Sequence, residues 1–367
     1  MNDNLKRYFA IQQALKSLRP SEPKGNLARH LNTFAMLVAG IIASGQTKLN
    51  HIARKVPDGA KPQSRIRRME RWLNNDRIDT ETFYLPYVHY LLAGLPEGPL
   101  VLVIDGSEIG RNCILLTINV LYQKRALPLC WLVVKGRKGH LAETLHIQLV
   151  EEAIKVVPQD RRIVFLGDGE FDGVDLLATL QKAGWHYVCR TAVNVELHQD
   201  GHTFAPKDLL LCPDDEIELP QVGFTHANYG PVLISILWDR GWKSPLVLVS
   251  NFDIIDEALY WYRRRFRIES FFSDQKSRGF HIGHSHIGDV AHMKRLVMAS
   301  CLAYIWVVCL GAWVLRTGKV PAIHRRDRCD WSLFQLGMAW LDYCLNEDLP
   351  IPVKFTVTFQ LPDKSVG

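Results

Sequence analysis

Uninterrupted apolar runs of strand length mark the middle of the chain. Residues 99–105 (PLVLVID) and 161–168 (RRIVFLGD) each end in an aspartate, as is typical of strands buried on both faces of a sheet. Residues 113–123 and 126–134 are two more runs separated by a short basic turn, so the first three runs along the chain predict an antiparallel meander. Residues 185–190 predict a further strand.

Helical periodicity surrounds these strands. Residues 140–157 have the apolar spacing of an amphipathic helix, and residues 174–184 form a second helical pattern that Gly184 ends. Three antiparallel strands followed by helix, strand, helix and strand is the element order of a ribonuclease H-like fold, in the α/β class. Further helical patterns occupy residues 30–45, 47–56, 64–75 and 330–345.

Changes of pattern divide the chain into five parts. Residues 1–95 predict a helical N-terminal domain, and residues 96–190 the first part of the core. Residues 191–250 contain short alternating strands and predict a β-rich insertion. Residues 251–316 return to helical texture as the helical part of the core, and residues 317–367 predict a C-terminal helical region with a loose tail.

One apolar stretch is long enough to cross a membrane. Residues 296–315 carry no charge and lie between Arg295 and Arg316. The alternative is a helix buried on all sides within a large α/β domain. Because we find no second stretch of this kind in the sequence, we expect a buried core helix and no membrane partner.

Composition narrows the class of protein. The chain of 367 residues has a net charge of +6, which suits a polyanionic partner without requiring one. Its eight cysteines are scattered without a C-x2-C pair and predict free, mostly buried thiols in a reducing cytoplasm. The first 20 residues lack the apolar run of a secretion signal, so we expect a cytoplasmic protein.

Four polar residues follow the spacing Y-x2-R-x3-E-x6-K: Tyr262, Arg265, Glu269 and Lys276. On one continuous helix they would share a stripe about 60° wide and roughly 21 Å long. An acid, two cations and a phenol in a row suit a metal ion and several phosphates. The alternative is an exposed helix with ordinary ion pairs between residues three or four apart.

Partner carboxylates for Glu269 are available where the buried strands end. Asp105 and Asp168 follow two such strands, and neighbouring strand ends lie about 5–10 Å apart. Three carboxylates with open positions suit Mg²⁺ or Mn²⁺, and two such ions can clamp the attacking and leaving oxygens on phosphorus. The alternative for each aspartate alone is a turn cap before the glycine that follows it.

The chain resembles the DDE transposases of bacterial insertion sequences, in the insertion-sequence-four family that carries a Tyr–Arg–Glu–Lys signature. The resemblance covers roughly residues 30–345 and rests on VLVIDGSEI around Asp105, ALPLCWLV, VFLGDGEFDG around Asp168, YRRRFRIESFFSDQKSRGF and SLFQLG. It implies that Asp105, Asp168 and Glu269 bind the metal ions and are catalytic. It also implies that Tyr262, Arg265 and Lys276 hold DNA phosphates.

The resemblance implies two further features outside the signature. In related transposases a tryptophan of the insertion stacks on a flipped base, and Trp238 and Trp242 are the candidates here, although a core position is as good an explanation. The sequence departs from the family after the lysine, where GFHIGHSHI places His281, His284 and His286. A DNA-facing or solvated loop explains these histidines better than a transition-metal site.

A basic stretch in the N-terminal domain predicts contact with DNA. Its two helical patterns, joined by a turn, resemble a helix-turn-helix with a basic second helix, and a solvated helical face is the alternative. The candidate residues are Arg65, Arg67, Arg68 and Arg71.

The sequence thus predicts a transposase that cleaves transposon ends and joins the 3′-hydroxyl to target DNA. The partner is double-stranded DNA, and pairing of two ends predicts a homodimer on DNA. The alternative is a non-catalytic DNA-binding protein derived from a transposase.

Overall fold

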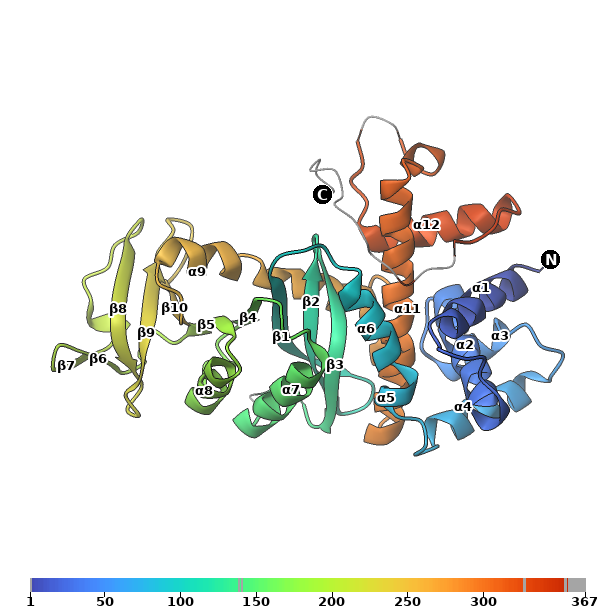
Figure 1. The fold of residues 1–367 in the computed structure, drawn as a ribbon, viewed down its shortest axis with the longest axis horizontal. Helices are drawn as coiled ribbons and strands as arrows, with labels where there is room; N and C mark the ends of the chain where they lie inside the picture. The colour runs from blue at the N-terminus through green and yellow to red at the C-terminus, as the bar shows by residue number, and fades with distance from the viewer. Residues whose placement is uncertain (1, 138, 140, 326–327, 353–354, 356–367) are drawn as a thin grey trace.

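The computed structural model describes residues 2–137, 139, 141–325, 328–352 and 355. Figure 1 shows three regions along the long axis of the molecule. The strands of residues 191–250 lie at one end, a mixed α/β region lies in the middle, and the N-terminal helices lie at the other end. The C-terminal helix packs beside the long helix that joins the middle region to the N-terminal helices.

The central feature is one sheet of ten strands in the order β3-β2-β1-β4-β5-β10-β9-β8-β6-β7. The first three strands pair antiparallel, whereas β4 pairs parallel with both β1 and β5. The predicted meander and the two later core strands are therefore confirmed. The strands are β1 (Leu100–Ile109), β2 (Cys113–Tyr122), β3 (Arg125–Lys135), β4 (Ile163–Gly167), β5 (His186–Thr191), β6 (Leu197–Gln199), β7 (His202–Phe204), β8 (Glu216–Phe224), β9 (Tyr229–Leu237) and β10 (Leu246–Ser250).

The sheet register brings the two aspartates side by side. Val103 of β1 pairs with Leu166 of β4, so Asp105 and Asp168 each lie two residues beyond that pair. The first predicted strand was too short, because β1 continues past Asp105 to Ile109 while paired with β2 alone. Asp105 therefore lies within a strand, at the level where the neighbouring strand β4 has just ended.

The predicted β-rich insertion extends the same sheet instead of folding separately from it. Strand β10 pairs antiparallel with β5, and β9 and β8 continue outward from β10. The hydrogen-bonding edge that β5 would otherwise expose is thus covered by the insertion. This arrangement fixes the insertion next to the strand ends that carry the aspartates.

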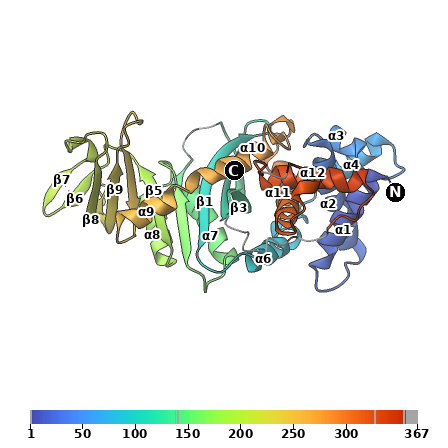
Figure 2. The ribbon, with the colours of Figure 1, turned by 90° about the horizontal axis from the view of Figure 1, so that it is seen from above.

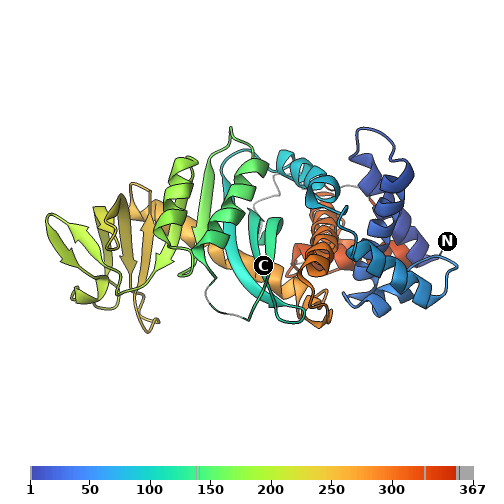
Figure 3. The same ribbon diagram turned by 90° about the horizontal axis from the view of Figure 1, so that it is seen from below.

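Helices cover both faces of the central strands. Helices α7 (Glu143–Val156) and α8 (Val174–Lys182) pack on one face, which Figure 3 shows. Helices α9 (Ile255–Tyr262) and α10 (Ile268–Gln275) run across the opposite face, as seen in Figure 2. Because both faces are covered, the central strands need apolar side chains on both sides, which explains why their sequences do not alternate between apolar and polar residues.

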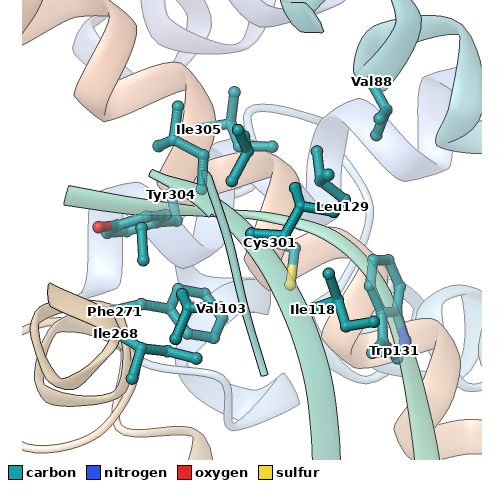
Figure 4. Packing of buried hydrophobic residues seen from close by; sticks show 14 of the residues in the cluster. Val88, Val103, Ile118, Leu129, Trp131, Ile268, Phe271, Cys301, Tyr304 and Ile305 are labelled. Atoms are coloured by element: carbon teal, nitrogen blue, oxygen red, sulfur yellow. The ribbon is translucent and has the colours of Figure 1, made fainter. Parts of the chain in front are cut away.

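The long apolar helix α11 (Val290–Arg316) is buried, as predicted. In its most apolar stretch 94% of the residues are buried inside the protein. Figure 4 shows Cys301, Tyr304 and Ile305 of α11 among side chains of β1, β2, β3 and α10, and the rings of Tyr304 and Phe271 are 5.3 Å apart. The prediction that the chain has only one apolar segment of membrane-spanning length was wrong. Helix α2 (Gly25–Ser44) is also long and apolar enough to span a membrane.

The N-terminal helices are fastened to α11. The buried guanidinium of Arg295 donates to the carbonyls of Leu73 and Ile78 at 2.7 and 3.1 Å, and it pairs with Asp76 at 2.7 Å. These carbonyls lie at and beyond the end of α4, where a cation is favourable. Besides α2, the helices of this region are α1 (Asp3–Ser17), α3 (Leu49–Arg54), α4 (Pro62–Leu73), α5 (Thr80–Phe83) and α6 (Leu85–Ala93), and α12 (Leu333–Asn346) completes the fold.

Candidate active site

Asp105 and Asp168 converge on one guanidinium. Oδ2 of each aspartate lies 4.0 Å from Nη1 of Arg265. The other oxygen of each accepts from a nearby backbone amide, Oδ1 of Asp105 from Gly106 at 2.7 Å and Oδ1 of Asp168 from Glu170 at 3.1 Å. Asp168 therefore caps the turn after β4 as well as facing Arg265, whereas the turn-cap alternative was wrong for Asp105, because that residue lies within β1.

The electrostatics of this pair favour an added positive charge. Burial and, to a smaller extent, the neighbouring Asp168 raise the pKa of the Asp105 carboxyl to about 6. The Gly106 amide and Arg265 act in the opposite direction without cancelling this effect. A single arginine at 4.0 Å from both carboxylates therefore does not offset the free-energy cost of keeping Asp105 ionised.

The predicted continuous helix through the signature was wrong. Helix α9 ends at Tyr262, a 3₁₀ turn covers Arg265–Arg267, α10 begins at Ile268, and Lys276 lies just beyond its end. A 3₁₀ turn has about 3.0 residues per turn, so it shifts the phase of the side chains that follow it. The four signature residues consequently differ in burial instead of sharing one stripe.

Tyr262 and Arg265 face inward. Tyr262 is 3% exposed and Arg265 is 8% exposed. Burial raises the pKa of the Tyr262 hydroxyl, and Arg265 and Arg190 oppose that shift. Nε of Arg265 is buried without a hydrogen-bond partner in the described part of the chain.

Lys276 reaches the sheet from the other end of α10. Its ammonium group donates to the Ser107 hydroxyl. Ser107 lies two residues after Asp105 on β1, so both side chains emerge on the same face of the strand. Arg265 and Lys276 therefore lie just before and just after α10, and this helix packs against the part of β1 that carries Asp105.

Glu269 is exposed on the first turn of α10. Within the described ranges, no three acidic, histidine or cysteine side chains gather closely enough to hold a metal ion. The structure thus brings Asp105 and Asp168 together, and it places Glu269 on the helix between Arg265 and Lys276 without joining it to the pair.

A cavity of about 690 Å³ opens at Arg265, and its lining does not include Asp105 or Asp168. Tyr262 and Arg265 line one side of it, and Trp242 and Lys243 of the insertion line another. Trp242 is 43% exposed, whereas Trp238 is half-buried, is not among the lining residues and donates its indole N–H to the Trp242 carbonyl at 3.1 Å. Of the two predicted tryptophans, only Trp242 shares a cavity with signature residues.

The four candidate arginines of α4 separate into two pairs. Arg65 and Arg68 both bind Asp58, at 2.6 and 2.8 Å, and thereby hold the turn between α3 and α4. These two contacts give Arg65 and Arg68 a structural role that the sequence prediction did not include. Arg67 and Arg71 are exposed and line a groove of about 790 Å³.

Three residues near the aspartates were not predicted as site residues from the sequence. Ser107 and Arg190 lie on strands, where they look like ordinary polar positions, and Glu170 belongs to the turn after β4. Glu170 contributes to the raised pKa of Asp105, and Arg190 lines the cavity with Tyr262. The closeness of Ser107 to Asp105 in the sequence was the one available signal.

Comparisons with known proteins bear on this arrangement. Residues 98–306 match the profile of the family described as the transposase DDE domain. The chain is similar to the cryo-EM structure of a piggyBac transposase synaptic complex with hairpin DNA, at 11% identity over 95% of this chain and 81% of that chain, with a TM-score of 0.49. It is also similar to human ENDOV, at 14% identity over 52% and 92% of the two chains, with a TM-score of 0.27.

Neither of these two similarities is close enough to carry an argument about activity, and no match is found among curated proteins. The family match is different, because it covers more than half of the chain and includes Asp105, Asp168 and Glu269. The chain therefore belongs to the transposase DDE domain family.

Proposed function

We propose that the protein is a DNA transposase of the insertion-sequence-four type with a ribonuclease H-like core. It cleaves the ends of its transposon and transfers the resulting 3′-hydroxyl to target DNA. The observation that carries the proposal is the convergence of Asp105 and Asp168 on Arg265 at the end of parallel strands. Arg265 lies at this point, Lys276 contacts Ser107 two residues beyond Asp105, and Glu269 is exposed on the helix between them.

The donor chemistry fits a divalent cation. Carboxylate oxygens are the ligands that Mg²⁺ and Mn²⁺ prefer. Burial and the neighbouring Asp168 raise the pKa of Asp105, and a bound cation would favour its ionised form. Asp105, Asp168 and Glu269 would hold the ions. When bound, such ions lower the pKa of water and stabilise the oxygen that leaves phosphorus.

The remaining signature residues would position the DNA strand. Arg265 has a planar fork of donors that matches two phosphate oxygens, and it lines the cavity that also contains Trp242. Lys276 would act on a second phosphate as a point charge, and the Tyr262 hydroxyl would bond to a backbone phosphate. Trp242, exposed in the shared cavity, is the better-placed residue for stacking on a displaced base.

The same arrangement argues against the non-catalytic alternative. A protein that only bound DNA would have no use for two adjacent carboxylates, because they repel phosphate and cost free energy when buried. Two transposon ends must be held together during transposition, so we also propose that the protein acts as a homodimer on DNA.

The test uses the purified full-length protein and a supercoiled plasmid carrying its gene with the natural flanking DNA. We expect cleavage at both boundaries of the element, with 3′-hydroxyl termini, in Mg²⁺ or Mn²⁺ and none in EDTA. Binding of the same plasmid fragments without cleavage under any of these conditions would favour the non-catalytic alternative.

A further inference from the structure

A second polar pocket lies beside the candidate active site. It has a volume of about 480 Å³, and its lining includes Lys276, Ser277, His281 and His284. The imidazole rings of His281 and His284 are stacked, with centroids 5.7 Å apart and planes 16° apart. One acid, Glu108 of β1, also lines it.

The loop that carries the histidines has a fixed backbone. The His281 amide donates to the Lys276 carbonyl at 3.0 Å, and the His281 carbonyl accepts from the Thr47 hydroxyl at 3.3 Å. Farther along the loop, the Arg111 amide donates to the Ile287 carbonyl at 2.9 Å. The pocket is thus built between the end of β1 and the loop that follows α10, and Thr47 of the N-terminal region holds the backbone of that loop.

The same loop leads from this pocket to the DNA-binding candidates of α4. Ile287 and His292 line the groove of about 790 Å³ that also contains Arg67 and Arg71. His292 lies against α4, because its Nε2 is 2.8 Å from Oδ1 of Asn74. A DNA strand running from α4 to the carboxylates would therefore cross the histidine loop.

We propose that the pocket formed by Lys276, His281 and His284 binds a backbone phosphate of DNA between the α4 groove and the candidate active site. This inference rests on the proposed function. The lining suits an anion, because it combines an ammonium group, two imidazoles and the Ser277 hydroxyl against a single acid. A metal site is less well supported, since no cluster of three ligating side chains exists among the described residues.

The two imidazoles decide how strongly the pocket attracts an anion. Lys276 and Glu108 are the other charged groups that line the pocket, and their charges oppose each other. The attraction for phosphate is therefore expected to depend on His281 and His284.

Gly283 allows a clean test of the charge in this pocket. It lines the pocket, lacks a positive φ, and an added Cβ would meet no atom within 4 Å. Glu, Lys and Gln at position 283 therefore add a negative, a positive or no charge without disturbing the loop. Gly283→Gln is the matched control.

The experiment measures binding of the full-length protein to a fluorescein-labelled duplex of about thirty base pairs at several salt concentrations. We expect Gly283→Glu to weaken binding about tenfold and Gly283→Lys to tighten it several-fold, relative to Gly283→Gln. For His281→Gln/His284→Gln we expect the slope of log K against log salt to fall by about one.

Equal affinity of the three Gly283 variants, with an unchanged salt slope in the histidine variant, would overturn the proposal. If inorganic phosphate bound to the pocket but displaced the duplex no better than chloride at equal ionic strength, the pocket would be assigned to free phosphate and the proposal would be overturned. The failure of the proposed function would look different, because wild-type protein would then not cleave the plasmid even if the Gly283 series behaved as expected.

Discussion

Replacing Asp168 by asparagine is expected to abolish DNA cleavage, with a rate loss of about 10³-fold or more, while leaving DNA binding intact. Asparagine keeps the shape of the side chain, and its amide oxygen can still accept from the Glu170 amide as Oδ1 does now. It removes the negative charge that Oδ2 of Asp168 presents next to Asp105 and Arg265. The measurement is single-turnover cleavage of the plasmid in Mg²⁺, with binding measured separately by gel shift.

A matched control exists on the helix that follows. Asp175 lies exposed in the first turn of α8, so Asp175→Asn changes the same charge at nearly the same place in the sequence. Its cleavage rate is expected to stay within about twofold of wild type, as surface substitutions usually do. If Asp168→Asn cleaved DNA as fast as Asp175→Asn, Asp168 would have no catalytic role.

Replacing Arg125 by alanine is expected to lower the free energy of unfolding by about 3–5 kcal/mol, the usual cost of leaving a buried charge without its partner. Nη1 of Arg125 lies 2.9 Å from Oδ2 of Asp274, which is 4% exposed. The pair joins the start of β3 to α10, the helix that carries Glu269. Urea denaturation of the variant and wild type measures the difference.

The pH dependence of this effect has a definite sign. Burial raises the pKa of the Asp274 carboxyl from 3.8 to about 6, against the attraction of Arg125 and Arg278. A folded-state pKa above the unfolded value means that the stability from this group is complete below about pH 4 and is lost as pH rises through about 6. Without Arg125 the pKa rises further, so the Arg125→Ala defect is expected to be larger at pH 8 than at pH 5.

Removing the acid as well should reverse most of the loss. In Arg125→Ala/Asp274→Asn no unpaired charge remains, and we expect recovery of more than half of the lost free energy at pH 8 and little pH dependence. A double variant as unstable as Arg125→Ala at both pH values would show that the arginine acts through packing instead of charge.

The core could be predicted from the sequence because strands buried on both faces are uninterrupted apolar runs. The apolar runs that end at Asp105 and Asp168 became β1 and β4, and the in-register pairing of these parallel strands placed the two aspartates together. Helix α11 was predicted as buried for a related reason, since an uncharged helix in an α/β domain packs apolar side chains on all sides.

Features that depend on tertiary contacts could not be predicted from the sequence. The 3₁₀ turn at Arg265–Arg267 follows from packing α9 and α10 on one face of the sheet, and the sequence there has no glycine or proline that would indicate a break in the helix. The pairing of Arg65 and Arg68 with Asp58 needs the geometry of the α3–α4 turn. The distinction between Trp238 and Trp242 depends on how the insertion extends the sheet beside Tyr262 and Arg265.

Glu269 is the residue on which the proposed mechanism depends most, because it is exposed on α10 and must join two half-buried aspartates. Its assignment as a metal ligand can be tested by Glu269→Cys, since a thiolate is a poor ligand for Mg²⁺ and a better one for Mn²⁺. Glu170→Cys is the matched control, because Glu170 also lies near Asp105 but accepts from the Leu141 amide at 2.7 Å.

The most direct measurement is therefore plasmid cleavage by Glu269→Cys in Mg²⁺ and in Mn²⁺, each relative to wild type. We expect no cleavage in Mg²⁺ and substantial recovery in Mn²⁺, while Glu170→Cys shows no such metal preference. Cleavage by Glu269→Cys in Mg²⁺ at the wild-type rate would contradict the assignment of Asp105, Asp168 and Glu269 as the metal-binding carboxylates.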